Sequence, residues 1–225
     1  MASIYERMLG QDFAKLHPRI RQRFGISSGD GIASVGCGEM QRIWYNKLAA
    51  VPLYIGTFRH IMFPQRGGNI PFSIENYAYR DRFGRETVSW IRKFKFPGAV
   101  RHFDATMIYS EERERIVDYL GNKQHLAVDL EVSASPEGGI RIRSGEQRFY
   151  EGFLQFRFPR LLTGSADVHE WYDEHEERYK ITVDVQSPIL GPVFRYEGVF
   201  QADFIPVKQE AIPIGIKPLR EERRE

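Results

Sequence analysis

The sequence predicts a β-rich α+β fold, in which a strongly curved antiparallel sheet or barrel of about ten strands is covered on one face or end by N-terminal helices. From Pro71 onward apolar and polar residues alternate, which is the period of a half-buried strand. The alternating segments are joined mostly by short turn-like sequences, and strands joined by tight turns must be antiparallel. No strand–helix–strand repeat indicates a parallel sheet, and a sheet of so many strands tends to curl or close.

Composition bounds the domain organisation. The chain has 225 residues, of which 42% are hydrophobic and 28% charged, so a single sizeable core is expected rather than disorder. Aromatic residues make up 13%, and they suit half-buried pleated surfaces. We therefore predict one β-rich domain over residues 1–207, with a helical region over about 1–64, and a charged tail over 208–225. We expect its last part, "PLREERRE" (residues 218–225), to be disordered or to fray.

Charge and cysteine content argue against several classes of protein. The formal net charge is +2, without the one-sided basic stripe of a nucleic-acid binder. Cys37 is alone and cannot form an intrachain disulfide, which argues against a disulfide-stabilised secreted protein. The first residues are amphipathic, unlike a signal peptide, and no run of about 18 apolar residues indicates a transmembrane segment. We expect a cytoplasmic protein that binds no nucleic acid.

The N-terminal segment, residues 4–25, is predicted to be helical. Gly10 could divide it into two helices, Pro18 could begin the second, and Gly25 suits the C-terminal end. The apolar residues recur at three- and four-residue spacing and form one stripe. They are Ile4, Met8, Leu9, Phe13, Leu16, Ile20 and Phe24.

A glycine-rich passage follows and leads into a predicted strand. Its glycines, Gly29, Gly31, Gly36 and Gly38, match neither of the two common phosphate-binding spacings. Residues 46–64 then predict a short or broken helix with Asn46 as N-cap. We expect its apolar stripe to pack against the domain. The stripe comprises Leu48, Val51, Ile55, Phe58, Ile61 and Met62.

The expected strands follow in order. Gly84 marks a hairpin turn between residues 71–81 and 85–96. In the last strand Phe194, Tyr196 and Phe200 share the side that we expect to face the core. Residues 159–164, "PRLLTG", predict a short connection or a helical turn. The remaining strand segments are 101–111, 113–121, 125–134, 140–144, 145–158, 166–173, 178–187 and 187–204.

Four short motifs occur in order along most of the chain, from about Tyr5 to Phe204. They are "YERMLGQDFAKLHP", Trp90-x-Arg92-x-Phe94, the strand at Gly152 that leads to "PRLLTG", and "PILGPVFRYEGVF". In this arrangement the chain resembles a bacterial domain-of-unknown-function family, copies of which can follow a saccharopine-dehydrogenase-like reductase segment. The resemblance implies a fold unit with no assigned activity, and it raises a reductase-type protein as a partner. No dinucleotide-binding fingerprint follows a strand in this chain.

The segment "VHEWYDEHEERY" carries the densest group of candidate metal ligands. It contains His169, Asp173 and His175, but not the H-E-x-x-H spacing of a zinc helix. We expect an exposed charged hairpin rather than a metal site, and we expect no cofactor. No base neighbours Cys37, which we expect to be buried or idle, and no G-x-S-x-G elbow is present, so no catalytic residue is assigned.

Arg92 is the most informative candidate residue. Alternation places it with Trp90 and Phe94 on the aromatic face of its strand, which we expect to point inward. A buried guanidinium needs an anionic partner. That partner is either the acidic head group of a ligand or a protein carboxylate such as Glu75, Glu131 or Glu197. The predicted ligand-binding residues are Trp90, Arg92, Phe94 and Tyr196.

A curved sheet with helices over its mouth can enclose a cavity. The interpretation we favour is a non-enzymatic module that binds an apolar or acidic amphipathic small molecule. Two alternatives stay open: an enzyme of unidentified reaction that uses the same cavity, and a barrel filled by side chains that acts only through protein partners. An internal cavity above roughly 300 Å³ would favour a ligand site.

Overall fold

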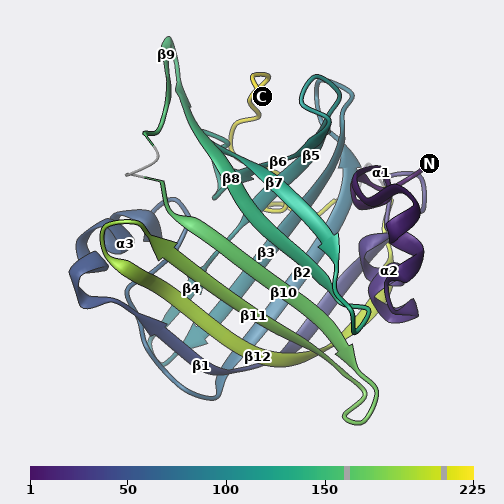
Figure 1. Ribbon diagram of the computed structural model, residues 1–225, viewed down its shortest axis with the longest axis horizontal. Coiled ribbons are helices and arrows are strands. Elements are labelled where there is room, and N and C mark those ends of the chain that lie inside the picture. Colours follow the sequence, from purple (N-terminus) through teal and green to yellow (C-terminus); the bar gives the residue numbers. More distant parts are fainter. Residues whose placement is uncertain (160–162, 209–211) are drawn as a thin grey trace.

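Twelve strands form one sheet in the computed structural model, which describes residues 1–159, 163–208 and 212–225 (Figure 1). The strands are β1 (Ile32–Tyr45), β2 (Ile70–Arg80), β3 (Glu86–Phe96), β4 (Ala99–His102), β5 (Ala105–Ser110), β6 (Arg115–Leu120), β7 (Leu126–Ala134), β8 (Ile140–Glu151), β9 (Leu154–Arg157), β10 (Ser165–Asp173), β11 (Arg178–Ser187) and β12 (Gly191–Pro206).

Ten of these strands close into an antiparallel barrel. They follow one another in the order β10-β11-β12-β1-β2-β3-β5-β6-β7-β8, and the pairing of β8 with β10 closes the ring. Strand β4 adds to β3, and β9 adds to β8, outside the ring. The prediction of a β-rich α+β fold with a curved sheet or barrel of about ten strands is confirmed.

Three short helical segments precede the barrel: α1 (Ile4–Leu9), η1 (Gly10–Lys15) and α2 (Pro18–Phe24). The Ser3 side chain caps α1 by accepting a hydrogen bond from the Glu6 amide at 3.1 Å, and Glu6 accepts one from the Ser3 amide. Gly10 has φ 54° and ends α1, while Pro18 begins α2. These helices lie at one end of the barrel (Figure 1), as predicted.

The barrel therefore has two different ends. The α1 end carries the turns after β2, β5, β7 and β10, and the other end, which we call the α3 end, carries η2 (Lys47–Ala49) and α3 (Ala50–Thr57). Asn46 caps this segment by accepting a hydrogen bond from the Leu48 amide, as predicted. We call the described segments at this end the α3-end loops; they are residues 46–69, 97–104, 121–125, 152–159 and 188–190.

The glycine-rich passage leads into strand β1, as predicted, and Gly36 and Gly38 within the strand permit close packing. A Cβ atom at Gly38 would lie 2.0 Å from the Val199 carbonyl oxygen, and one at Gly36 would lie 2.8 Å from the Phe200 ring. Only glycine allows the neighbouring strand to approach so closely. Cys37, which we expect to be buried or idle, lies between them and is exposed, so burial does not apply.

The inward faces of β2, β3 and β12 bring aromatic rings together. Phe94 lies between Phe72 and Tyr196, with ring centroids 5.0 and 5.2 Å away. Phe194 and Phe200 are also buried. The face predicted to point inward in the last strand is therefore confirmed.

The structure corrects the prediction for the α3 segment. Of the side chains in α3, Leu53 is buried, while Val51, Ile55 and the following Phe58 stand in solvent with exposed fractions of 71%, 63% and 67%. The predicted packing is therefore wrong for Leu48, Val51, Ile55 and Phe58, whereas Ile61 and Met62 at the end of the same stripe contact the interior. A short helix on the rim of a closed barrel has little uncovered core to contact, because the strands already bury one another's inward faces.

The structure also corrects the strand predicted over residues 145–158. Residues 140–151 form one continuous strand, β8, and the chain then reverses at Gly152, which has φ 57°. Strand β9 folds back on β8, so that Phe156 pairs with Phe149. Glycine is the residue that most readily adopts this left-handed conformation. The predicted connection over 159–164 lies partly outside the described residues.

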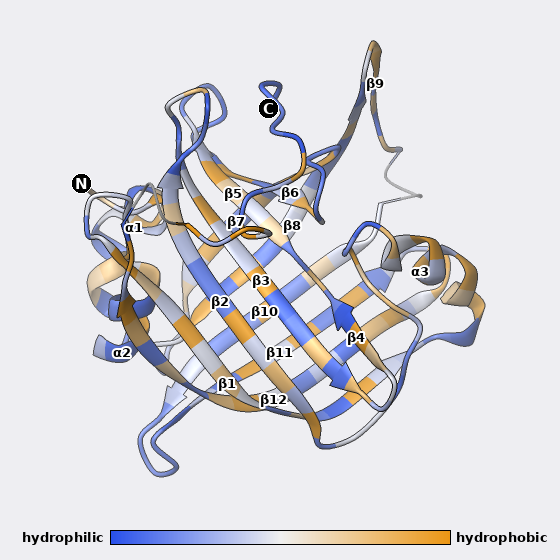
Figure 2. Cartoon of the chain, turned by 180° about the vertical axis from the view of Figure 1, so that it is seen from behind, coloured by the Kyte–Doolittle hydropathy of each residue, from blue (hydrophilic) through white to orange (hydrophobic). Residues whose placement is uncertain are grey.

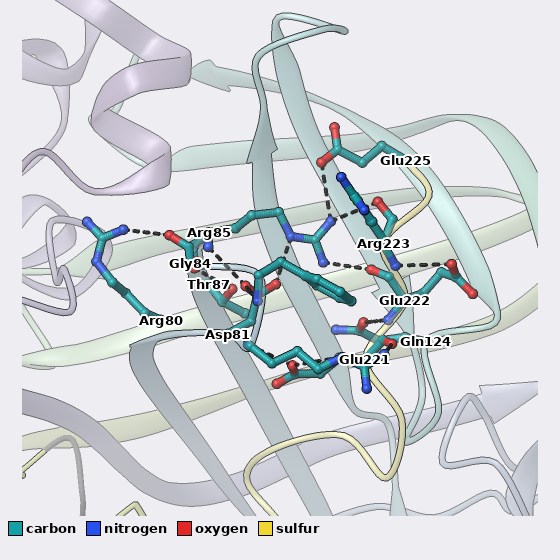
Figure 3. Close-up of polar contacts among 12 residues, drawn as sticks. Arg80, Asp81, Gly84, Arg85, Thr87, Gln124, Glu221, Glu222, Arg223 and Glu225 are labelled. Carbon is teal, nitrogen blue, oxygen red and sulfur yellow. Dashed lines mark hydrogen bonds and ion pairs between the residues drawn. The ribbon is translucent and has the colours of Figure 1, made fainter.

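The described tail residues 212–225 pack on the outside of the barrel. Ile216 is buried against Tyr77 and Ile91 on the outer faces of β2 and β3. Figure 3 shows Arg85 at the centre of the contacts that hold the chain end: its Nη2 donates to the Glu222 carbonyl oxygen at 2.6 Å, and its Nη1 lies 3.2 Å from the Glu225 carboxylate. The prediction that this part of the tail is disordered or frays is wrong, because its charged groups find fixed partners.

Replacing Arg85 with glutamine should lower the free energy of unfolding by roughly 1.5–3 kcal/mol, the usual range for hydrogen bonds to charged groups. Arg85 also pairs with Asp81 at 2.7 Å, so the change loosens both the β2–β3 turn and the tail. Denaturant unfolding measures the effect. Arg21→Gln is the matched control, because Arg21 is exposed on α2 and its side chain has no hydrogen bond or ion pair with the described tail. Equal stability of the two variants would show that the tail contributes nothing.

Candidate functional site

A cavity of about 160 Å³ lies inside the barrel. Four of its lining residues are polar: Arg92, Asp118, Ser144 and Gln147. The others are apolar, and they come from seven strands, from the α3-end loops and from the residue just before β10. They are Ile61, Met62, Trp90, Phe103, Met107, Leu120, Leu126, Val128, Leu130, Ile142, Gly164, Ala166, Val168, Val183 and Val185.

Arg92 points inward from β3, as its alternation predicts, and is 3% exposed. Its Nε donates to the Phe103 carbonyl oxygen at 2.7 Å, and its Nη1 donates to the Tyr196 hydroxyl at 3.1 Å. The guanidinium lies 4.0 Å from the centre of the Phe103 ring and 5.5 Å from that of Trp90. Neutral groups and ring faces therefore hold this cation in place.

None of the three carboxylates considered from the sequence is the partner of Arg92. Glu75 pairs with Lys93 at 2.7 Å, and Glu131 and Glu197 are exposed on the outside of the barrel. They belong to the outward positions of their strands, so these predictions are wrong. In the part of the chain that the structure describes, no carboxylate forms an ion pair with Arg92.

Asp118 is the carboxyl group that shares the cavity with Arg92. It lies on the inward face of β6 and is 6% exposed, and its Oδ1 has no hydrogen-bond partner among the described residues. Burial raises the pKa of Asp118 to about 7, although the positive charge of Arg92 acts to lower it. Near neutral pH this carboxyl group is therefore close to half protonated.

The four predicted ligand-binding residues divide into two pairs. Trp90 and Arg92 line the cavity. Phe94 and Tyr196 belong to the aromatic cluster beside it, and Tyr196 reaches the site only through the hydrogen bond that its hydroxyl accepts from Arg92. The indole Nε1 of Trp90 is a buried donor without a partner among the described residues.

A second polar group occupies the interior nearer the α1 end. The Arg23 side chain enters the barrel from α2, and its Nε lies 2.7 Å from Glu170 Oε1 on β10. Its Nη1 donates to Ser34 Oγ at 2.7 Å and its Nη2 to Asn76 Oδ1 at 3.2 Å. Each of its three nitrogens has a partner, so this arrangement holds α2 to the barrel.

At the α3 end, His60, His102 and Asp104 have ligand-type atoms within 4.8 Å of one another. The Nδ1 atoms of His60 and His102 lie 2.7 and 3.3 Å from Asp104 Oδ2. The two rings are stacked, 4.2 Å apart and tilted by 20°. The lone pair of imidazole lies in its ring plane, so two nearly parallel rings cannot both direct lone pairs to one ion. The trio fits a pair of stacked rings beside a carboxylate, with one hydrogen bond between His60 and Asp104, better than a metal centre.

Asp104 connects this stack to the cavity. Its Oδ1 accepts a hydrogen bond from the Arg92 amide at 3.2 Å. Burial acts to raise the pKa of Asp104, but the hydrogen bonds and charges of His102 and His60 outweigh it and lower the pKa below its ordinary value. The carboxylate therefore stays ionised, and it fixes the loop that carries Phe103 over the cavity.

The charged segment 168–179 forms the hairpin that the sequence predicts. His169 stacks on Trp171 with ring centroids 4.7 Å apart, and His175 lies in the turn between β10 and β11. The nearest carboxylate to His169 is that of Glu137, at 3.1 Å.

Two buried charged residues were not predicted from the sequence, although their positions in the apolar pattern indicated burial. Asp118 alternates with Ile116 and Leu120, and Arg23 stands between Ile20 and Phe24 on a helical stripe. Both are charged residues at apolar positions, which is the feature that drew attention to Arg92. The His60–His102–Asp104 stack had no such signal, because two separate loops bring it together.

The fold and the interior define a class: a closed antiparallel barrel whose apolar cavity carries a buried cation and a buried carboxyl group. The chain belongs to the family described as Domain of unknown function (DUF4166), which matches residues 16–200. It is similar to the uncharacterized protein YndH of Bacillus subtilis (strain 168), with 35% identity over 204 residues that cover 90% of this chain and 98% of that protein. No solved structure matches the chain. Within the described ranges, every helix is too short or too polar to cross a membrane.

Proposed function

We propose that the barrel binds a small amphipathic carboxylic acid, with its head group at Arg92 and its chain in the apolar cavity. The observation that carries this proposal is the buried guanidinium of Arg92, which faces an apolar cavity, donates to neutral oxygens and forms no ion pair with the described residues. A buried charge is costly unless it is paired. A ligand carboxylate would supply the missing negative charge and accept from the guanidinium.

Asp118 is a second residue that can bind the carboxylate head group of the ligand. In its protonated form it can donate a hydrogen bond to a ligand carboxylate, and its raised pKa keeps that form populated near neutral pH. When Asp118 ionises, it repels the ligand and competes for Arg92. Binding should therefore weaken as the pH rises through about 7.

The cavity size favours a short ligand. Its volume of about 160 Å³ does not reach the roughly 300 Å³ that we expect to favour a ligand site, so only a small group can be enclosed. It is comparable to the engineered cavity of about 150 Å³ that holds benzene. A carboxyl group and a few carbons fit inside, and Ile61 and Met62 line the side from which a longer chain would extend toward the α3 end.

Octanoate is the probe for this proposal, and isothermal titration calorimetry is the measurement. We expect Arg92→Met to weaken octanoate binding by about tenfold or more, since each tenfold is about 1.4 kcal/mol of lost charge pairing. Octan-1-ol, which has the chain without the charge, should bind both proteins equally. Arg195→Met is the matched control, because Arg195 lies on the outside of β12 and pairs with Asp184.

Two results would overturn the proposal. The first is that the native protein does not bind octanoate. The second is that native and Arg92→Met proteins bind it with equal affinity, which would mean that Arg92 has only a structural role. Affinity that fails to fall between about pH 6 and about pH 8 would remove Asp118 from the site while leaving Arg92 in it.

A further inference from the structure

The exposed apolar side chains of this barrel are concentrated at one end. In the η2–α3 segment, Leu48, Val51, Tyr54, Ile55 and Phe58 are all more than half exposed. Soluble monomers rarely leave contiguous apolar patches of this kind uncovered, and such patches mark interaction sites.

Other loops extend this apolar surface. At the tip of the β8–β9 hairpin, Phe153 is 95% exposed, and Leu154 and Phe156 are about half exposed. Ile189 and Val100 add exposed side chains from two further loops of the α3 end. Figure 2 shows α3 and the β9 hairpin projecting from this same end of the barrel. We call these side chains the apolar rim; they belong to the same end of the barrel as Ile61 and Met62, which line the cavity.

The charges of this end are one-sided, although the whole chain is nearly balanced at +2. The α3-end loops contain one carboxylate, Asp104, which is buried and bonded to the histidine stack. Their cations are Lys47, Arg59, Arg66, Arg101, Lys123 and Arg157. Lys123 and Arg157 reach back to glutamates of β8, but the first four have no ion pair with any described residue.

We propose that the α3 end docks on an anionic lipid bilayer surface, with the apolar rim inserted at the interface and the surrounding cations facing the lipid head groups. Apolar side chains beside lysine and arginine, with few acidic groups, are the composition of surfaces that lie on membranes. The rim consists of separate projections, a helix and a hairpin tip, rather than one groove. A fluid interface can accommodate such projections, whereas a folded protein partner would need a complementary surface for each.

This docking goes beyond the ligand site and does not require it. If both hold, the mouth of the cavity faces the bilayer, and an amphipathic acid could pass between them without crossing water. The two proposals rest on different residues. A mutation that abolishes ligand binding should therefore leave membrane docking intact, and a mutation that abolishes docking should leave ligand binding intact.

Vesicle flotation with the full chain tests the docking. The probes are phosphatidylcholine vesicles and mixed phosphatidylcholine–phosphatidylserine vesicles. We expect the protein to float with the mixed vesicles, and the bound fraction to fall as salt is added, because exposed charges are screened. Phe58→Ser with Phe153→Ser should reduce the partition coefficient by about tenfold or more, since both rings would otherwise enter the interface.

Controls on the same molecule separate the rim from general surface effects. Phe83→Ser with Ile205→Ser removes two exposed apolar side chains from the α1 end and should leave flotation unchanged. Lys47→Gln with Arg59→Gln should weaken binding to the mixed vesicles by about tenfold, while the exposed Arg82→Gln should not. Arg92→Met should float like the native protein, and the Phe58/Phe153 variant should still bind octanoate.

Several outcomes would overturn the docking. One is that the native protein does not float with mixed vesicles. Another is that the Phe83/Ile205 variant loses as much vesicle binding as the Phe58/Phe153 variant. Sedimentation that shows a dimer dissolved by Phe58→Ser with Phe153→Ser would assign the rim to a second copy of this chain instead.

Discussion

The native protein should become less stable as the pH rises from about 4 to about 7, and replacing Asp118 with asparagine should abolish this decrease. Asp118 is buried in the cavity, and burial raises its folded-state pKa to about 7 from an ordinary value of 3.8. Between these two values the folded protein holds a proton that the unfolded chain has released. The free energy of unfolding therefore decreases with rising pH across this window and levels off above it.

The size of this effect follows from the pKa difference. The difference between a folded-state pKa of about 7 and the ordinary value of 3.8 is worth roughly 4 kcal/mol. Asparagine has nearly the same shape and does not ionise, so the native protein should lose roughly that much relative to Asp118→Asn between about pH 4 and about pH 8.

Denaturant unfolding at a series of pH values measures this difference. Asp203→Asn is the matched control, because Asp203 is exposed on the outer side of β12. The free energy of unfolding of Asp203→Asn, plotted against pH, should run parallel to that of the native protein. Parallel curves for Asp118→Asn as well would show that Asp118 ionises freely and that the interior is open to water.

Replacing Arg23 with methionine should lower the free energy of unfolding by roughly 3–5 kcal/mol, the usual cost of breaking a buried ion pair from one side. The side chains of Arg23 and Glu170 are both fully buried, and their charged atoms lie 2.7 Å apart. Methionine would leave the Glu170 carboxylate without its cation. Glu170 Oε2 already has no hydrogen-bond partner among the described residues, so nothing nearby compensates.

A double variant separates the ion pair from simple packing. Arg23→Met with Glu170→Met replaces both charges by apolar side chains, and it should recover most of the lost stability, because an apolar pair avoids the cost of desolvation. Arg21→Met is the control, since Arg21 is exposed on the same helix. If the double variant is less stable than Arg23→Met alone, Ser34 and Asn76 must depend on the charges, and the simple ion-pair account would be wrong.

Local periodicity was sufficient for much of the fold. Residues such as Trp90, Arg92 and Phe94 alternate with a period of two, so the inward face of β3 could be predicted without knowing its neighbours. The same holds for Phe194, Tyr196 and Phe200 in β12. Gly10, Pro18 and Gly25 marked the ends of the N-terminal helices, because such signals act within one turn.

The sequence by itself therefore determined the barrel class, the inward faces and the buried position of Arg92. Only the tertiary structure decided which charges meet there. Glu170 lies 147 positions from Arg23, and its pairing depends on how β8 and β10 close the ring. It also decided that the apolar stripe of α3 stays exposed, although the similar stripe around Ile20 is buried. The physical reason is that periodicity is a property of neighbouring residues, whereas burial depends on what remains uncovered after distant strands have paired.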